Sequence, residues 1–308
     1  MAVSARLETA VGSLKLANPV LAASGTFGYG LDLLEFCPPE SLGAVVTKGL
    51  SPRPRRGNPT PRIVETAAGM INAIGLQNIG VDAFCREALP ELQARRAVVI
   101  VNVFGERMDE YVEVIERCER EGGIAGYELN VSCPNVTAGG MEFGHDPGPL
   151  ERLTAMCRAA TRRQLWVKLS PNAPNLVATA QAAVAGGAEA LTLINTVRAM
   201  AIDAVARRPV LANKIGGLSG PAVKPIALRM VWEVHTALPT VPLVGIGGIE
   251  SGRDVAEFLL AGASAVQVGT AIFRDPAAPV RIAAELARFC DEHGIADVRE
   301  LVGGLQWR

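Results

Sequence analysis

Eight short runs of apolar and β-branched residues recur along the chain, and this repetition constrains the fold more than any other sequence feature. Most runs end in glycine, asparagine, serine or proline, which typically close a strand. We expect each run to form a buried β-strand. The predicted strands are Val20–Gly25, Ala44–Gly49, Ala97–Gly105, Gly126–Ser132, Leu165–Pro171, Ala190–Thr196, Val241–Gly248 and Ala265–Ile272.

Segments with a helical pattern separate most of these strands. In Asp109–Glu121 the apolar residues fall on one stripe, and Asn175–Ala185 and Asp254–Leu260 are similar, the last with Ser251 as a capping residue. Strands that alternate with helices form a parallel sheet. Eight such units favour closure into an α/β TIM barrel, (β/α)8, over an open doubly wound sheet. We expect a single domain over residues 1–308.

Two connections are longer than the others: Leu50–Arg96 after the second strand and Val197–Thr240 after the sixth. Both leave the C-terminal ends of strands, where barrel enzymes build their active sites, so we expect functional insertions there. The opening segment Leu7–Leu16 alternates around a short turn and predicts a hairpin that caps the barrel bottom.

Composition and charge exclude several classes of protein. The chain carries 30 basic and 31 acidic side chains, with no basic face interleaved with aromatic residues, which disfavours nucleic-acid binding. No uninterrupted apolar run is long enough to span a membrane, and the start does not resemble a signal peptide. The six cysteines lack metal-ligand or disulfide spacing. We therefore expect a reduced, cytoplasmic enzyme without a metal.

Polar residues in the predicted strands lie almost exclusively at their C-terminal ends. A polar or charged group inside an apolar strand costs several kcal/mol unless it is paired. Closure of a barrel brings all eight ends around one pocket, so such residues would converge there. The members of this set are Ser24, Lys48, Asn102, Asn130, Lys168 and Asn195.

Glycines close the last two predicted strands, at Gly247-Gly248 and Gly269-Thr270. Glycines after the seventh and eighth strands of a barrel are typical of a phosphate site, because their backbone N–H groups can approach the phosphate closely. The glycines of Gly216–Gly220 could add further backbone amides to the same site. Two lysines beside a phosphate site would stabilise a cofactor whose reduced form is an anion, such as a flavin. The alternative for either lysine alone is a salt bridge to a barrel carboxylate.

Cys133 lies just beyond the fourth predicted strand, whereas the other cysteines lie in helical or loop stretches. A thiol whose pKa is lowered by nearby cations can act as a general base. Asn72, Asn130, Asn135 and Asn195 supply amides that both donate and accept, which suits a cyclic imide. We expect a mobile loop of the first long connection to deliver Asn72; the alternative is a simple turn residue.

These residues lie in segments that resemble the dihydroorotate dehydrogenase family, in particular the catalytic subunit of its cytosolic, NAD-linked, heteromeric (class 1B) branch. The resemblance covers nearly the whole chain. The segments that carry it are Ala23–Gly30, Val45–Arg62, Gly69–Gly80, Glu128–Asn135, Val167–Asn172, Ile194–Thr196, Pro209–Val231, Gly245–Ile249 and Gln267–Ala271.

The resemblance implies FMN as cofactor and Cys133 as the catalytic base, where the membrane-bound, quinone-linked branch has serine. The implied FMN contacts are Ser24, Lys48, Gly49, Asn102, Asn130, Lys168, Ile194, Gly220, Gly247, Gly248, Gly269 and Thr270. The implied contacts to dihydroorotate or orotate are Lys48, Asn72, Ala73, Ile74, Gly75, Leu76, Asn130, Asn195 and Thr196.

The implied reaction is the oxidation of dihydroorotate to orotate in pyrimidine (UMP) biosynthesis. Cys133 would remove a proton from C5 while C6 passes a hydride to N5 of FMN. A homodimer core would join a second protein that carries FAD and a [2Fe–2S] cluster and passes electrons to NAD; direct use of fumarate without a partner is an alternative. The segment Gly139–Pro147 departs from the family pattern at Glu142 and at His145, where threonine is expected.

Three other interpretations fit parts of the pattern. A flavin-dependent reductase of dihydropyrimidine type would use a similar barrel with a substrate that lacks a carboxylate. An aldolase would form a Schiff base on Lys168 or Lys48. A non-catalytic scaffold would bind no flavin.

Overall fold

The computed structural model describes residues 5–131 and 143–306, and its core is a closed ring of eight parallel strands. The order around the ring is β10-β15-β16-β3-β4-β7-β8-β9. Each strand corresponds to one of the predicted runs, so the predicted TIM barrel is confirmed. The barrel strands are β3 (Val20–Ala22), β4 (Ala44–Val46), β7 (Val99–Val103), β8 (Ile124–Asn130), β9 (Gln164–Lys168), β10 (Ala190–Leu193), β15 (Leu243–Ile246) and β16 (Ala265–Val268).

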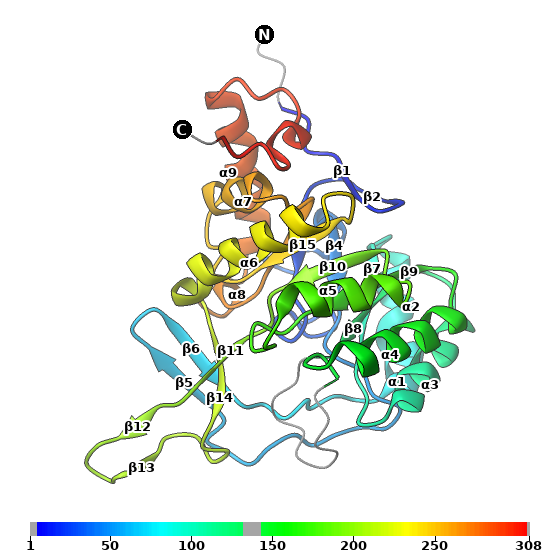
Figure 1. Ribbon diagram of the computed structural model, residues 1–308, viewed down its shortest axis with the longest axis vertical. Coiled ribbons are helices and arrows are strands. Elements are labelled where there is room, and N and C mark those ends of the chain that lie inside the picture. Colours follow the sequence, from blue (N-terminus) through cyan, green and yellow to red (C-terminus); the bar gives the residue numbers. More distant parts are fainter. Residues whose placement is uncertain (1–4, 132–142, 307–308) are drawn as a thin grey trace.

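Helices surround this ring and connect successive strands (Figure 1). Ser251 caps α7 as predicted. Its side chain accepts a hydrogen bond from the backbone N–H of Asp254, and the Asp254 carboxylate accepts one from the backbone N–H of Ser251. The α-helices are α1 (Val81–Ala83), α2 (Leu89–Ala94), α3 (Met108–Glu119), α4 (Pro147–Ala160), α5 (Leu176–Ala185), α6 (Lys224–Ala237), α7 (Gly252–Leu260), α8 (Ala271–Arg274) and α9 (Ala278–Glu292). Short 3-10 turns are η1 (Pro39–Ser41), η3 (Pro221–Val223) and η4 (Val298–Leu301), and η2 (Phe84–Ala88) is a π-helical turn.

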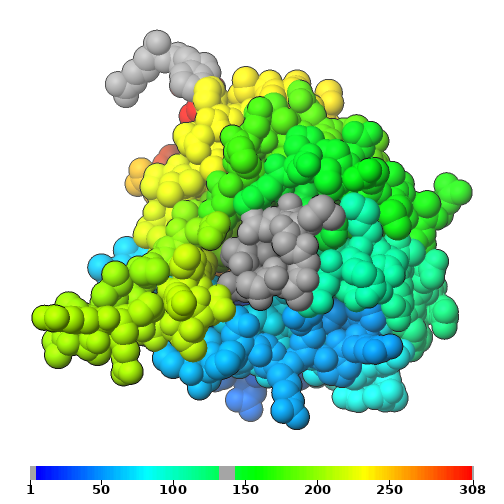
Figure 2. Space-filling model, turned by 60° about the horizontal axis from the view of Figure 1, so that its bottom comes forward, coloured from blue at the N-terminus to red at the C-terminus, as the bar shows by residue number. Residues whose placement is uncertain are grey.

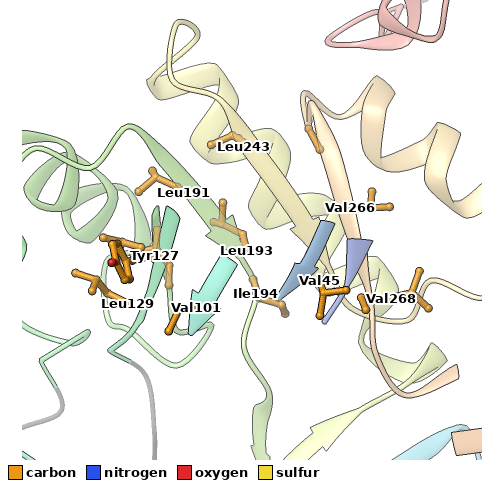
Figure 3. Packing of buried hydrophobic residues seen from close by; sticks show 14 of the residues in the cluster. Val45, Val101, Tyr127, Leu129, Leu191, Leu193, Ile194, Leu243, Val266 and Val268 are labelled. Carbon is orange, nitrogen blue, oxygen red and sulfur yellow. The ribbon is translucent and has the colours of Figure 1, made fainter. Parts of the chain in front are cut away.

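Two hydrophobic clusters divide the strand residues by the direction in which they point. Side chains that face the helices, such as Val45, Val101 and Val266, form the larger cluster (Figure 3). Their neighbours along the strands, such as Ile100 and Trp166, fill the barrel interior. This alternation is the period-two pattern of a strand that is buried on both faces.

The predicted N-terminal hairpin is present and closes the barrel bottom. It consists of β1 (Thr9–Val11) and β2 (Leu14–Leu16), paired antiparallel. Val11 and Leu16 belong to the same cluster as the side chains of the barrel interior. The apolar side chains of the hairpin therefore cover the barrel interior at the N-terminal end of the strands.

The two long connections contain strands that the sequence pattern did not predict. β5 (Ile63–Thr66) and β6 (Gly69–Asn72) come from the first connection, and β11 (Val197–Ala199) and β14 (Gly216–Ser219) come from the second. They form one antiparallel sheet in the order β11-β14-β6-β5, called the wall sheet below. Asn72 thus lies in a paired strand and not in the expected mobile loop, because it pairs with Ile63 of β5 and with Gly217 of β14.

A further hairpin, β12 (Ile202–Asp203) with β13 (Arg208–Pro209), projects from the body beyond the wall sheet (Figures 1 and 2). No helix within the described ranges is long and apolar enough to cross a membrane.

Candidate active site

A cavity of about 350 Å³ lies at the C-terminal mouth of the barrel, between the strand ends and the wall sheet. Its volume is in the range typical of small-molecule sites. Most of the predicted site residues line it. They are Ser24, Lys48, Gly49, Asn72, Ile74, Gly75, Leu76, Asn130, Lys168, Ile194, Asn195, Thr196, Gly220, Gly247, Gly248, Gly269 and Thr270.

Two of the predicted site residues that the structure describes do not line this cavity. Asn102 and Ala73 are fully buried and do not line the cavity. Asn102 nevertheless lies directly behind the lining residue Gly49, because a Cβ on Gly49 would lie 2.9 Å from Oδ1 of Asn102. Cys133 lies outside the described residues, as do Asn135 and Glu142. The roles assigned to these residues stay predictions.

Backbone without side chains forms one end of the cavity. Gly220 has a φ of +94°, and a Cβ there would lie 2.7 Å from Cα of Gly69. A Cβ on Gly248, whose φ is +71°, would lie 2.8 Å from the carbonyl oxygen of Gly220. Only glycine fits both positions, and Gly269 and Thr270 lead into α8 beside them. Such a cradle of closely spaced backbone suits a phosphate group.

Lysine side chains give the cavity a positive character. Lys48 follows β4, and burial together with the charge of Arg62 lowers its pKa from the ordinary 10.5, against an opposing effect from Asp32. Lys168 is the last residue of β9, and its Nζ lies 3.8 Å from Oε1 of Glu128. The salt-bridge alternative therefore applies to Lys168, which both pairs with a barrel carboxylate and lines the cavity.

A connected set of amides forms the side of the cavity next to Lys168. Asn195 donates through Nδ2 to Oδ1 of Asn130 at 3.2 Å, and Oδ1 of Asn195 accepts from the N–H of Thr196 at 2.8 Å. Asn172 donates through Nδ2 to the carbonyl of Thr196 at 3.1 Å. These bonds fix the orientation of groups that can donate to and accept from a planar heterocycle.

The wall sheet closes the cavity from the outside. Ile63, Met70 and Leu218 line it from β5, β6 and β14. Asn72 at the end of β6 donates through Nδ2 to the carbonyl of Gly217 at 3.4 Å, which ties the two long connections together. The sequence analysis missed these apolar lining residues, because it assigned no strands to either connection.

Sequence reasoning also missed the residues beneath and behind the cavity. Glu128 and Gln267 are fully buried and hydrogen-bonded to each other inside the barrel. Asn172 braces the Thr196 segment. Glu128, Asn172 and Gln267 all lie in segments that carry the family resemblance, so the signal was present but was read only for residues expected to contact ligands.

Comparisons with known proteins point to one family. The family model described as dihydroorotate dehydrogenase matches residues 6–290. A protein of Geotalea uraniireducens (strain Rf4), named dihydroorotate dehydrogenase B (NAD(+)), catalytic subunit, is 54% identical over 299 residues, which cover 97% of this chain and 98% of that protein. A protein of the same name from Trichlorobacter lovleyi is 55% identical over 300 residues, with the same two coverages.

A solved structure supports the fold. The structure of DHODH from Eimeria tenella in complex with ferulenol superimposes with a TM-score of 0.81 and covers 97% of this chain and 88% of that chain. Its sequence identity is 24%, so this similarity concerns the fold alone.

Proposed function

Because the chain belongs to the dihydroorotate dehydrogenase family, we propose that it is an FMN-dependent catalytic subunit that oxidises dihydroorotate to orotate in pyrimidine biosynthesis. The observation that carries the proposal is a cavity with a bare-backbone cradle at one end and a lysine- and asparagine-lined recess at the other. A flavin phosphate and a planar, anionic imide have complementary chemistry to these two ends.

The residues present fit FMN. Gly220 and Gly248 let backbone segments pack closely at this end of the cavity, because a Cβ on either would meet neighbouring backbone. Gly269 and Thr270 extend this cradle, which suits a phosphate group. When bound, FMN supplies the acceptor for the hydride that leaves C6 of the substrate. Lys168 and Asn130 would hold the ring from the strand ends, and positive charge there favours the reduced, anionic form of a flavin.

This chain's own residues supply substrate binding and proton removal. Lys48 would pair with the substrate carboxylate, while Asn72, Asn130 and Asn195 would pair with the alternating N–H and C=O groups of its ring. The wall sheet contributes the apolar side chains of Ile63, Met70 and Leu218, which would cover a substrate bound in the recess. Cys133 would accept the C5 proton as general base.

We also propose an electron-transfer partner and a cytoplasmic location. The relatives at 54% and 55% identity are named NAD(+)-linked and catalytic subunits, which supports a second protein that accepts electrons from this chain. This partner would carry FAD and a [2Fe–2S] cluster, bind a homodimer of this chain and pass electrons to NAD. The alternative is that fumarate accepts the electrons directly from this chain. Co-purification of such a protein with NADH-linked activity would distinguish the two.

The role of Cys133 is tested by two substitutions. We expect Cys133→Ala to retain FMN but to lose most turnover near neutral pH, by about 100-fold or more, because the alanine cannot accept a proton. Cys133→Ser should be partly active, with a rate that rises toward higher pH, since a hydroxyl has a higher pKa than a thiol and is ionised less near neutral pH. Flavin reduction by dihydroorotate measures both. An alanine variant as fast as the unmodified chain would disprove this role.

A further inference from the structure

Directly beneath the cavity, the barrel interior changes from apolar to polar. On β7, β9 and β16 the lower interior positions are Ile100, Trp166 and Ala265, and all three are fully buried. The next inward positions on these strands are Asn102, Lys168 and Gln267. Glu128 on β8 joins this layer, because its carboxylate is hydrogen-bonded to both Asn102 and Gln267. Lys168 also lines the cavity, so this layer is the cavity floor.

The Glu128 carboxylate is the centre of this layer. Its Oε1 accepts from Nδ2 of Asn102 at 2.7 Å, and its Oε2 accepts from Nε2 of Gln267 at 2.6 Å. Because β8 and β16 lie four places apart in a ring of eight strands, the bond to Gln267 spans the barrel interior. A carboxylate with no exposed surface would be very unfavourable without these partners and the ammonium of Lys168 at 3.8 Å.

Glu128 also fixes which way the two amides face. A carboxylate only accepts hydrogen bonds, so Asn102 and Gln267 must both turn their NH₂ groups toward it. Their oxygens, Oδ1 of Asn102 and Oε1 of Gln267, then face elsewhere and have no hydrogen-bond partner among the described residues. Oδ1 of Asn102 lies immediately behind the cavity wall at Gly49.

We propose that Glu128 is a positioning residue that sets the charge presented to the flavin: it holds Lys168 at the cavity floor as a partly neutralised cation and orients Asn102 and Gln267 around it. This proposal rests on the proposed FMN site. A bare lysine would stabilise the reduced, anionic flavin more strongly than a lysine beside a carboxylate. Glu128 therefore keeps the flavin easier to reoxidise by the next electron carrier.

The test is Glu128→Gln in the FMN-loaded protein, read by the flavin midpoint potential and by the dissociation constant of the flavin–sulfite adduct. Positive charge near the ring stabilises that adduct as it stabilises the reduced flavin. We expect a higher potential and roughly tenfold tighter sulfite binding, because the substitution removes the negative charge that lies 3.8 Å from the Lys168 ammonium. Neither measurement requires turnover.

The control is Glu119→Gln, which removes another multiply bonded carboxylate. Glu119 accepts from Tyr127, Thr161 and Arg163 and does not line the cavity. This variant should lose stability and leave both flavin measurements unchanged. A Glu128→Gln protein with the potential and sulfite affinity of the unmodified chain would overturn the proposal, whereas an unmodified chain that binds no FMN would instead overturn the proposed function.

The double variant Glu128→Gln/Gln267→Glu covers the case in which the single variant loses FMN. It keeps one carboxylate and one amide in the layer but moves the negative charge to the opposite wall, onto β16. We expect it to bind FMN with a potential still above that of the unmodified chain. A purely structural role predicts the original potential, and that result would overturn the proposal. Failure of both variants to bind FMN would also overturn it, because a positioning role does not make Glu128 indispensable for binding.

Discussion

At the scale of single residues, Lys48 shows how the cavity combines burial with charge. Burial and the nearby Arg62 lower its pKa from the ordinary 10.5, and Asp32 opposes this only in part. The ammonium is therefore less favourable in the folded chain than in water. An anion that binds beside it would gain a partner for a poorly solvated cation.

This lowered pKa predicts a pH dependence of orotate binding. As the pH rises through the lowered pKa, Lys48 loses its proton, and the dissociation constant for orotate should rise at a pH below 10.5. Lys48→Arg keeps its charge throughout this range and should bind orotate with little change over the same pH interval. Flavin spectral shifts during orotate titration measure both. The same pH dependence in both proteins would assign the titration to another group.

For Lys168, the sequence predicted the location of the side chain but not its salt-bridge partner. The position of Lys168 at a strand end predicted that it would line the pocket, and it does. A salt bridge to a barrel carboxylate was the alternative, but its partner could not be named, because the inward or outward direction of a glutamate on a neighbouring strand depends on register. That register is a property of the closed barrel and not of either segment alone.

At the scale of elements, the wall sheet determines the shape of the recess. β14 lies between β6 and β11, and Gly217 pairs with Asn72 on one side and Arg198 on the other. A Cβ on Gly217 would lie 1.9 Å from Oγ1 of Thr196, a cavity-lining residue. The absent side chain therefore makes room for Thr196 under the sheet.

We expect Gly217→Ala to displace Thr196 and to weaken orotate binding about tenfold, or ~1.4 kcal/mol, with FMN still bound. The matched control is Gly122→Ala, because a Cβ there meets only Nε2 of Gln93 at 3.8 Å. Isothermal titration of orotate into the two FMN-loaded variants measures the effect. If both variants bound orotate with equal affinity, the position of Thr196 would not depend on the absence of a side chain at Gly217.

The wall sheet could not be predicted from periodicity. Its strands are three or four residues long, and β6 and β14 are separated by well over 100 residues of chain. Short strands with partly exposed faces lack the continuous apolar runs that revealed the barrel strands. Asn72 and Gly220, at or next to the ends of these strands, were nevertheless identified from their residue types and from the family resemblance, and both line the cavity.

At the scale of the whole molecule, the barrel was predictable because each strand is buried on both faces. Such strands carry their own signal, and eight of them allow few other arrangements. Closure then brings strand-end residues from Ser24 to Thr270 to one mouth, although they are distant in sequence. The expectation of a single domain over residues 1–308 stays a prediction.

The central claim is that this mouth holds FMN and delivers dihydroorotate to it. The most direct measurement is anaerobic mixing of the purified chain, without any partner, with one equivalent of dihydroorotate while the flavin absorbance is followed. We expect the chain to be yellow, its flavin to bleach, and orotate to form in equal amount. A chain that binds no flavin, or whose bound flavin stays oxidised, would contradict it.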